Sequence, residues 1–86
     1  MTSRRSRAAL LVLTELAADP ARSLWGLELH RLTGVRLQTL YPLLTRLEAR
    51  GWLSSAWEDI DPVREGRPRR RLYRLTDVGR EVAATY

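Results

Sequence analysis

The stretch LYPLLTRLEARGWL at residues 40–53 decides the fold of this chain, and RLYRLTDVGR follows it at residues 71–80 after an arginine-rich segment. Four leucines recur at the spacing of one helix face: Leu40, Leu43, Leu44 and Leu47. This spacing predicts a helix over about residues 38–50 that buries the leucines. Gly51 stands where a residue in the left-handed conformation commonly ends a helix. The second stretch alternates as a strand does, so the order of parts indicates a helix joined to a β-hairpin.

The face of the predicted helix opposite the leucines carries side chains that do not need burial: Gln38, Thr39, Tyr41, Thr45, Arg46 and Ala49. Such side chains can hydrogen-bond to base edges and phosphates or contact them directly. Proline costs a helix little only in the first turn, so Pro42 predicts a helix start at Thr39 or a close neighbour. The free amides of that turn, beside Arg36 and Tyr41, would suit a phosphate. From the pattern alone, this face is either an ordinary solvated surface or one that enters a DNA groove.

Two strands and the loop between them are expected to form a wing. Residues 52–57 alternate, and residues 70–75 form the matching strand, with Tyr73 and Leu75 facing inward. The loop contains three strand breakers: Pro62, Gly66 and Pro68. Four arginines of this segment are candidate contacts to a phosphate backbone or a narrow minor groove: Arg64, Arg67, Arg69 and Arg70. Acidic residues lie mainly in the first half of the hairpin, so the tip and the return strand keep a positive charge.

Polar residues that can cap a helix predict two further helices before residue 38. The first is expected to begin at Ser3 or Ser6, either of which can cap it, and to end at Ala18. The second is expected over residues 24–32 with Ser23 as its cap. A glycine-containing turn then leads into the helix described above, as in a helix-turn-helix unit.

Thr76 is the predicted cap of a short last helix over residues 77–86. The predicted fold class is therefore α+β and mainly helical: a winged helix-turn-helix with three N-terminal helices, a two-stranded β-hairpin wing and a short C-terminal helix. A chain of 86 residues can close only one small core, so we expect a single domain over residues 1–86.

Composition excludes several kinds of site. The chain has no cysteine and only one histidine, His30, so we expect no metal site, no catalytic constellation, no cofactor and no enzymatic activity. The formal net charge of +5 favours a polyanionic partner. All 15 basic residues are arginine, which first indicates a GC-rich coding sequence, so their positions are more informative than their type. No apolar run reaches the roughly 18 residues of a membrane span, and we expect a cytoplasmic protein.

The chain resembles the PadR family of winged helix-turn-helix transcriptional regulators. The run TLYPLLTRLEARGWL at residues 39–53 is similar to that family's Thr-Leu-Tyr-Pro helix and the strand after it, and RPRRRLYRLTDVGR at residues 67–80 is similar to the end of its wing. A weaker similarity covers LWGLEL at residues 24–29, where Gly26 and Glu28 agree with the family.

The resemblance implies a cytoplasmic repressor that binds double-stranded DNA at a near-palindromic operator as a homodimer. Its third helix would lie in the major groove and its wing, about residues 58–71, on the backbone or in the minor groove. The expected DNA-binding residues are Arg36, Gln38, Thr39, Tyr41, Thr45, Arg46, Arg64, Arg67, Arg69 and Arg70. Family members usually carry a longer C-terminal dimerisation helix, so this chain is read as a short form that would dimerise through its N-terminal and C-terminal helices.

Some interpretations stay open at this point. A winged helix can also serve as a protein-interaction module that pairs with another regulator. Trp52, Trp57 and Tyr73 are interpreted as core residues rather than as the wall of an effector cavity. A small-molecule effector is possible but is not indicated by the sequence. Trp25 could lie in the core, in an interface or in a pocket wall, and His30 is expected at the surface or near a phosphate.

Overall fold

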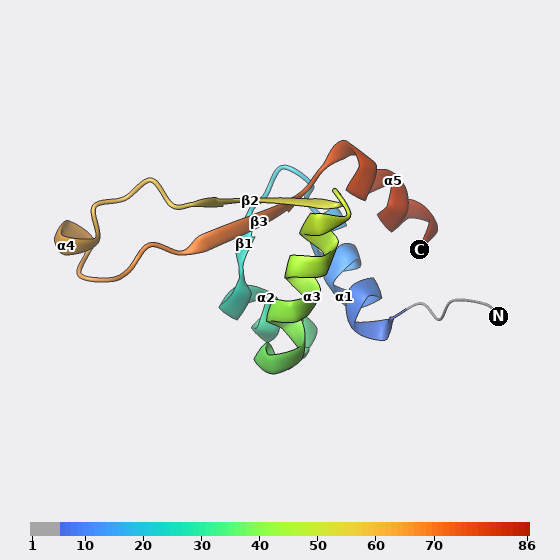
Figure 1. Cartoon of the computed structure of the whole chain (residues 1–86), viewed down its shortest axis with the longest axis horizontal. Coiled ribbons are helices and arrows are strands. Elements are labelled where there is room, and N and C mark those ends of the chain that lie inside the picture. The colour runs from blue at the N-terminus through green and yellow to red at the C-terminus, as the bar shows by residue number, and fades with distance from the viewer. Residues whose placement is uncertain (1–5) are drawn as a thin grey trace.

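The computed structural model describes residues 6–86, so the alternative cap at Ser3 lies outside the described residues. Within this range the chain forms five helices and three strands: α1 (Arg7–Ala17), β1 (Leu24–Trp25), α2 (Gly26–Thr33), α3 (Leu37–Ala49), β2 (Leu53–Trp57), α4 (Pro62–Glu65), β3 (Arg71–Leu75) and α5 (Asp77–Thr85). Four of the helices gather at one end of the molecule, and β2 and β3 extend from them as a long wing that has α4 at its tip (Figure 1). This arrangement confirms the predicted mainly helical α+β class with a wing.

Two of the predicted caps are confirmed. The Ser6 hydroxyl accepts a hydrogen bond from the amide of Ala9 at 3.1 Å and begins α1. The Thr76 hydroxyl accepts from the amide of Gly79 at 2.9 Å and begins α5. Each cap satisfies an amide that has no partner within its own helix.

The predicted start of the second helix is wrong. Residues 24 and 25 form the short strand β1 instead, where Leu24 pairs with Tyr73 and Trp25 with Leu72. Ser23 is therefore not the cap; Trp25 is the N-cap residue of α2, and the Glu28 carboxylate accepts from its backbone amide at 3.3 Å. The sheet consequently has three antiparallel strands in the order β1-β3-β2, not the two that were predicted. Pairing with β1 covers an edge of β3 that a simple hairpin would leave open.

The position of Pro42 was also wrongly predicted. The helix α3 begins at Leu37 with Arg36 as its N-cap, so Pro42 lies inside the helix rather than in its first turn. At this position proline withholds the amide hydrogen that would bond to the carbonyl of Gln38. The end of the helix agrees with the prediction, because Gly51 follows it with a φ of 80°.

The wing contains a helical turn that was not predicted. In α4, Asp61 caps the turn by accepting from the amide of Val63 at 3.1 Å, Pro62 occupies the first turn, and Gly66 ends it with a φ of 69°. Aspartate, proline and a later glycine at this spacing are the usual signals of a helix start and stop, so the sequence did carry the information.

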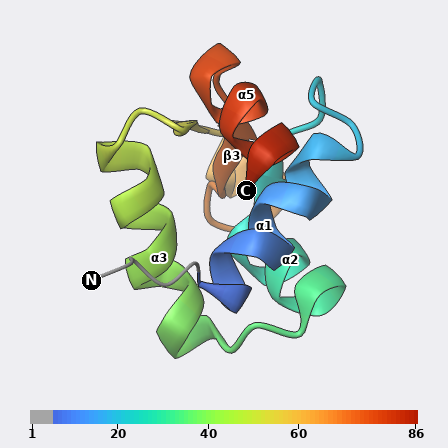
Figure 2. The ribbon, with the colours of Figure 1, turned by 90° about the vertical axis from the view of Figure 1, so that its right-hand side faces the viewer.

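The core lies between α1, α2, α3 and the base of the sheet, and Figure 2 shows the helices surrounding it. The four leucines predicted to be buried on α3 are confirmed: Leu40, Leu43, Leu44 and Leu47. Trp52 and Tyr73 pack against the core as predicted, but Trp57 is 62% exposed, so its assignment to the core was wrong. Because Trp57 lies at the end of β2, beyond the helices that cover its base, no core side chain reaches it.

The approach of α5 to the base of β2 requires a glycine. A Cβ atom on Gly79 would lie 1.9 Å from the carbonyl oxygen of Trp52. The amide of Thr76 donates to the same oxygen at 3.0 Å, so backbone contact fixes where α5 begins. α5 in turn contacts α1, which closes the helical body.

Candidate nucleic-acid interface

The exposed face of α3 carries the residues that the sequence proposed for DNA contact. Gln38, Thr39, Tyr41, Thr45 and Arg46 are all exposed, and so is Arg36 at the start of the helix. The acidic residue of α3, Glu48, is half-buried and accepts a hydrogen bond from the Ser55 hydroxyl at 2.7 Å. The outer face of α3 therefore presents basic and neutral polar groups without an opposing carboxylate.

Tyr41 is positioned by the start of α2. The Tyr41 ring and hydroxyl lie 2.6 to 2.8 Å from where a Cβ atom on Gly26 would be, so the absence of a side chain at Gly26 makes room for the ring. Tyr41 nevertheless remains 47% exposed. It is thus a side chain of the outer surface that a neighbouring helix supports.

The wing arginines differ in what they contact. The Arg67 guanidinium donates two hydrogen bonds to the Glu58 carboxylate, at 2.6 and 3.1 Å. Glu58 also accepts from the amide of Arg70 at 2.9 Å. The hydrogen bond from Arg67, assisted by that from the Arg70 amide and by the charges of both arginines, lowers the pKa of Glu58 to about 2. Glu58 thereby joins the two sides of the wing and neutralises Arg67.

The guanidinium groups of Arg64, Arg69 and Arg70 form no ion pair with a carboxylate of the described residues. Arg64 is exposed on α4, and Arg69 is exposed with its Nε donating to the carbonyl of Ile60 at 3.0 Å. The guanidinium of Arg70 lies over the Trp25 ring, with Cζ 4.0 Å from the ring centroid. Of the four predicted wing contacts, Arg67 is therefore the one whose charge an internal ion pair already balances.

A second network joins α3 to the wing through residues that the sequence reasoning missed. Arg71 donates from Nε to the Ser55 hydroxyl at 2.9 Å, and Ser55 donates to Glu48 of α3. The Arg71 guanidinium also lies over the Trp57 ring, 5.2 Å from its centroid. In the sequence, Arg71 is only one member of an arginine run, because the pairing of Trp57 with Arg71 depends on the strand register.

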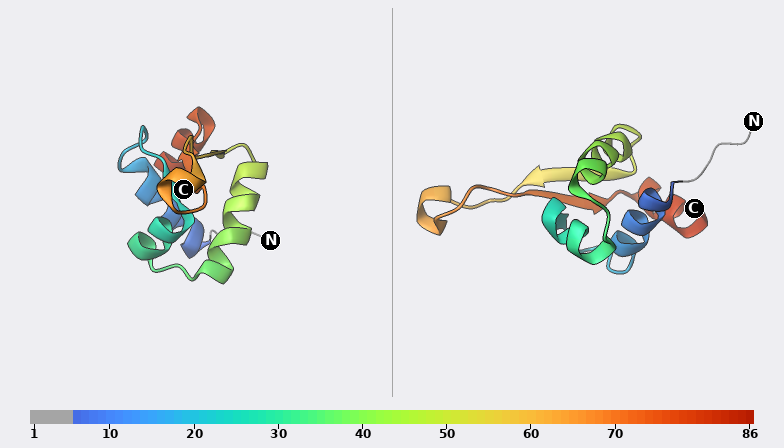
Figure 3. Two further views of the ribbon diagram at one scale, coloured as in Figure 1. Left: turned by 90° about the vertical axis from the view of Figure 1, so that its left-hand side faces the viewer. Right: turned by 90° about the horizontal axis from the view of Figure 1, so that it is seen from below.

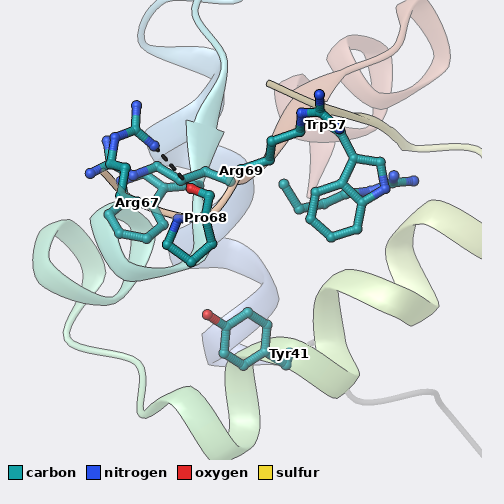
Figure 4. Close-up of a pocket in the computed structure, with 8 residues that line it drawn as sticks. Tyr41, Trp57, Arg67, Pro68 and Arg69 are labelled. Atoms are coloured by element: carbon teal, nitrogen blue, oxygen red, sulfur yellow. Dashed lines mark hydrogen bonds between the residues drawn. The ribbon is translucent and has the colours of Figure 1, made fainter. Parts of the chain in front are cut away.

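Arg71 and Trp57 also help to line a cleft of about 370 Å³ between α3 and the wing. Figure 4 shows Tyr41 on α3 facing the wing residues, which include Trp57, Arg67, Pro68 and Arg69. The full lining is Trp25, Tyr41, Trp57, Arg67, Pro68, Arg69, Arg70 and Arg71. It combines three aromatic rings with four arginines and contains no carboxylate.

His30 has a structural role near the start of α3. His30 Nδ1 lies 2.8 Å from the carbonyl oxygen of Val35, so His30 supports the turn before α3. Over residues 6–86, no group of histidine, aspartate and glutamate side chains is arranged to hold a metal ion. No helix in the same range is long and apolar enough to cross a membrane.

Comparison with solved structures places this fold among winged-helix regulators. The chain is similar to the PcaV transcriptional regulator of Streptomyces coelicolor, with a TM-score of 0.77, 26% identity, and coverage of 96% of this chain and 53% of that one. It is similar to a PadR family regulator of Eggerthella lenta, with a TM-score of 0.71, 31% identity, and coverage of 88% and 64%. A complex of a mutant MarR of Escherichia coli with operator DNA matches with a TM-score of 0.72, 24% identity, and coverage of 93% and 51%, which shows the shared fold.

The chain spans about half to two thirds of the length of these solved relatives. Among curated proteins, no sequence matches it significantly. The family model for the PadR-like transcriptional regulators matches residues 27–85, which include α3, the wing and α5. This match covers most of the chain, and the family is one of regulators rather than of enzymes. The chain therefore belongs to the PadR-like family of transcriptional regulators.

Proposed function

We propose that this protein is a cytoplasmic repressor that binds DNA in a sequence-specific manner. In this proposal α3 lies in the major groove, and the wing lies along the backbone or in the adjacent minor groove. The main support is the cleft in which Tyr41 of α3 faces the arginines of the wing. Because of this arrangement, α3 and the wing can contact the same partner. The mutant MarR that shares this fold was solved with operator DNA, which supports a DNA partner.

The charge around the cleft supports a polyanionic partner such as DNA. The exposed face of α3 has no opposing carboxylate, and the wing adds the exposed Arg64 and Arg69 beside three exposed acids, Asp59, Asp61 and Glu65. Glu58, the half-buried acid of the wing, is bound to Arg67 and does not repel a phosphate as a free carboxylate would. The wall of the cleft itself contains arginines and no carboxylate, which suits a phosphate backbone.

We also propose that the protein binds a near-palindromic operator as a homodimer. A regulator with one reading helix per subunit covers two half-sites about one helical turn apart when two subunits are related by a twofold axis. The DNA-contacting set on each subunit is then Arg36, Gln38, Thr39, Tyr41, Thr45 and Arg46 from α3 and its cap, with Arg64, Arg67, Arg69 and Arg70 from the wing.

The salt dependence of DNA binding tests this proposal. If the dimer neutralises about six phosphates, the slope of log affinity against log salt should be close to about −5. Arg69→Ala should make the slope shallower by about 0.9 for each phosphate that is no longer neutralised, since the terminal nitrogens of Arg69 donate to no described residue. Arg74→Ala, at an exposed position of β3 that does not line the cleft, is the control and should leave the slope unchanged. Binding that is indifferent to salt would contradict the proposal.

Base reading is tested separately. Gln38→Ala should reduce discrimination between operator and random DNA by about 1–3 kcal/mol, because an amide side chain can form paired hydrogen bonds with one base edge. Competition binding with both DNAs measures the ratio. Equal losses on operator and random DNA would remove Gln38 from the reading residues.

A further inference from the structure

We propose that the cleft between α3 and the wing seats the sugar-phosphate ridge of one DNA strand, with Trp57 packing on deoxyribose and Arg70 and Arg71 bound to phosphates. This inference rests on the proposed function. It adds Trp57 and Arg71 to the DNA-contacting residues and assigns Arg70, already expected to contact DNA, to a phosphate. A helix in the major groove and a wing in the adjacent minor groove lie on opposite sides of one strand, so that ridge passes between them. The cleft is the space between these two elements.

Arg70 is prepared for phosphate binding by the way it is held. Its guanidinium rests with Cζ 4.0 Å from the centroid of the Trp25 ring, an arrangement that uses the face of the group and leaves its edges free. Over residues 6–86, no acceptor takes a hydrogen bond from this guanidinium. A restrained arginine with unused donors loses less side-chain entropy on binding than a mobile one.

Arg71 is also held by an aromatic ring and a hydrogen bond. Its Nε donates to Ser55, its guanidinium lies over Trp57, and its terminal nitrogens donate to no residue in the described part of the chain. The link from Ser55 to Glu48 anchors this arginine to α3. The two arginines thus occupy fixed positions on a wall that contains no carboxylate.

The aromatic walls match the sugar rather than the phosphate. Trp57 is 62% exposed and Tyr41 47% exposed, so both offer apolar surface that the fold itself does not cover. Pro68 adds a further apolar group to the lining. Deoxyribose presents C–H groups between successive phosphates. The cleft likewise places the apolar surfaces of Tyr41 and Trp57 beside the guanidinium groups of Arg70 and Arg71. A purely ionic site would not need exposed indole.

Trp57→Ala and Trp57→Phe test this assignment, with Trp52→Phe as the matched control. Trp52 is half-buried at the base of the sheet, where it contacts Tyr86 with ring centroids 6.3 Å apart. Trp57→Ala should weaken operator binding by about fivefold to tenfold because apolar contact is removed, while the salt slope stays that of the unmodified protein. Trp57→Phe should recover much of the affinity, and Trp52→Phe should bind as the unmodified protein does. Arg70→Met should instead reduce the slope by about 0.9 for each phosphate released.

Each other result has a definite meaning. If the unmodified protein binds DNA and Trp57→Ala binds equally well, the ridge does not contact Trp57 and this inference is overturned while the proposed function stands. If Trp57→Ala changes the slope as Arg70→Met does, Trp57 acts only by holding arginines, which also overturns the sugar contact. Failure of the unmodified protein to bind any DNA removes the proposed function itself. Circular dichroism of each variant verifies folding, which the exposure of Trp57 should preserve.

Discussion

At the scale of single residues, Glu58 connects the two sides of the wing. Its carboxylate binds the guanidinium of Arg67 and the backbone amide of Arg70, which lie on the return side of the hairpin. The amide of Glu58 donates to the carbonyl of Arg70 at 2.9 Å, so the contact is reciprocal. Glu58 lowers the net positive charge of the wing, and it also fixes the positions of Arg67 and Arg70.

The pH dependence of the wing should follow from this carboxylate. Its pKa falls from 4.5 to about 2 on folding, so its contribution to stability is complete above pH 4.5 and is lost as the pH falls through 2. The difference in unfolding free energy between the unmodified protein and Glu58→Gln should therefore shrink over this interval. Urea denaturation at several pH values measures that difference, and exchange of the Arg70 amide reports the wing directly.

Glu65→Gln is the control for this experiment, because Glu65 is an exposed acid of the same wing. It should show a much smaller pH-dependent difference. If Glu58→Gln and Glu65→Gln behave alike, the ion pair with Arg67 does not stabilise the wing in solution.

At the scale of elements, α3 combines a well-determined buried face with an internal proline. Its four leucines are buried, while the carbonyl of Gln38 lacks its usual intrahelical donor at Pro42. Packing of the leucine face, rather than complete backbone hydrogen bonding, thus maintains the helix through this point.

Pro42→Ala should therefore stabilise the protein. The replacement supplies the missing amide hydrogen and removes the clash with the preceding turn, a gain of up to about 3 kcal/mol, reduced by about 0.4–1 kcal/mol because alanine gives the unfolded chain more freedom. Urea denaturation should show a net increase of about 2 kcal/mol in the free energy of unfolding. Thr45→Ala, at an exposed position of the same helix, should change it by only a few tenths. A loss of stability in Pro42→Ala would mean that water or a bent helix already accommodates the proline.

At the scale of the whole molecule, a small helical body carries a wing that reaches far beyond it. The molecule measures 51 × 26 × 21 Å, and Figure 3 shows the wing leaving the body on one side and the last helix α5 lying on the other. The proposed DNA-contacting elements and the helices α1 and α5 are thus separated, which leaves α1 and α5 available for contact with a second subunit.

We expect a homodimer through α1 and α5, because Leu10 on α1 is 42% exposed and Val78 on α5 is 53% exposed. Leu10→Glu should weaken dimerisation by about tenfold or more, since a charge would be buried without a partner. Sedimentation equilibrium measures the dissociation constant. Val63→Glu, at a side chain 91% exposed on the wing tip, is the control and should leave it unchanged. A protein that sediments as a monomer with and without DNA would contradict the homodimer.

The sequence predicted most of what depends on neighbouring residues. Helix spacing identified α3 and its leucines, hydroxyl caps placed the starts of α1 and α5, and glycine ended α3 at the expected residue. The candidate site was predicted as a set of residues on α3 and the wing, and their roles in DNA contact stay predictions. Its cleft could not be predicted, because Trp25, Tyr41 and Trp57 come together only when three separate elements meet.

The sequence by itself thus determined the helix-turn-helix and wing, since periodicity and caps act within a few residues of the chain. Only the tertiary structure decided that residues 24 and 25 pair with β3, that Glu58 binds Arg67, and that Trp25 supports Arg70. These outcomes depend on strand register and on contacts between residues that are distant in the sequence. Each such contact forms only when the rest of the fold brings the two residues together. For this reason an arginine run that looks uniform in sequence becomes, in the folded protein, a set of groups with different partners.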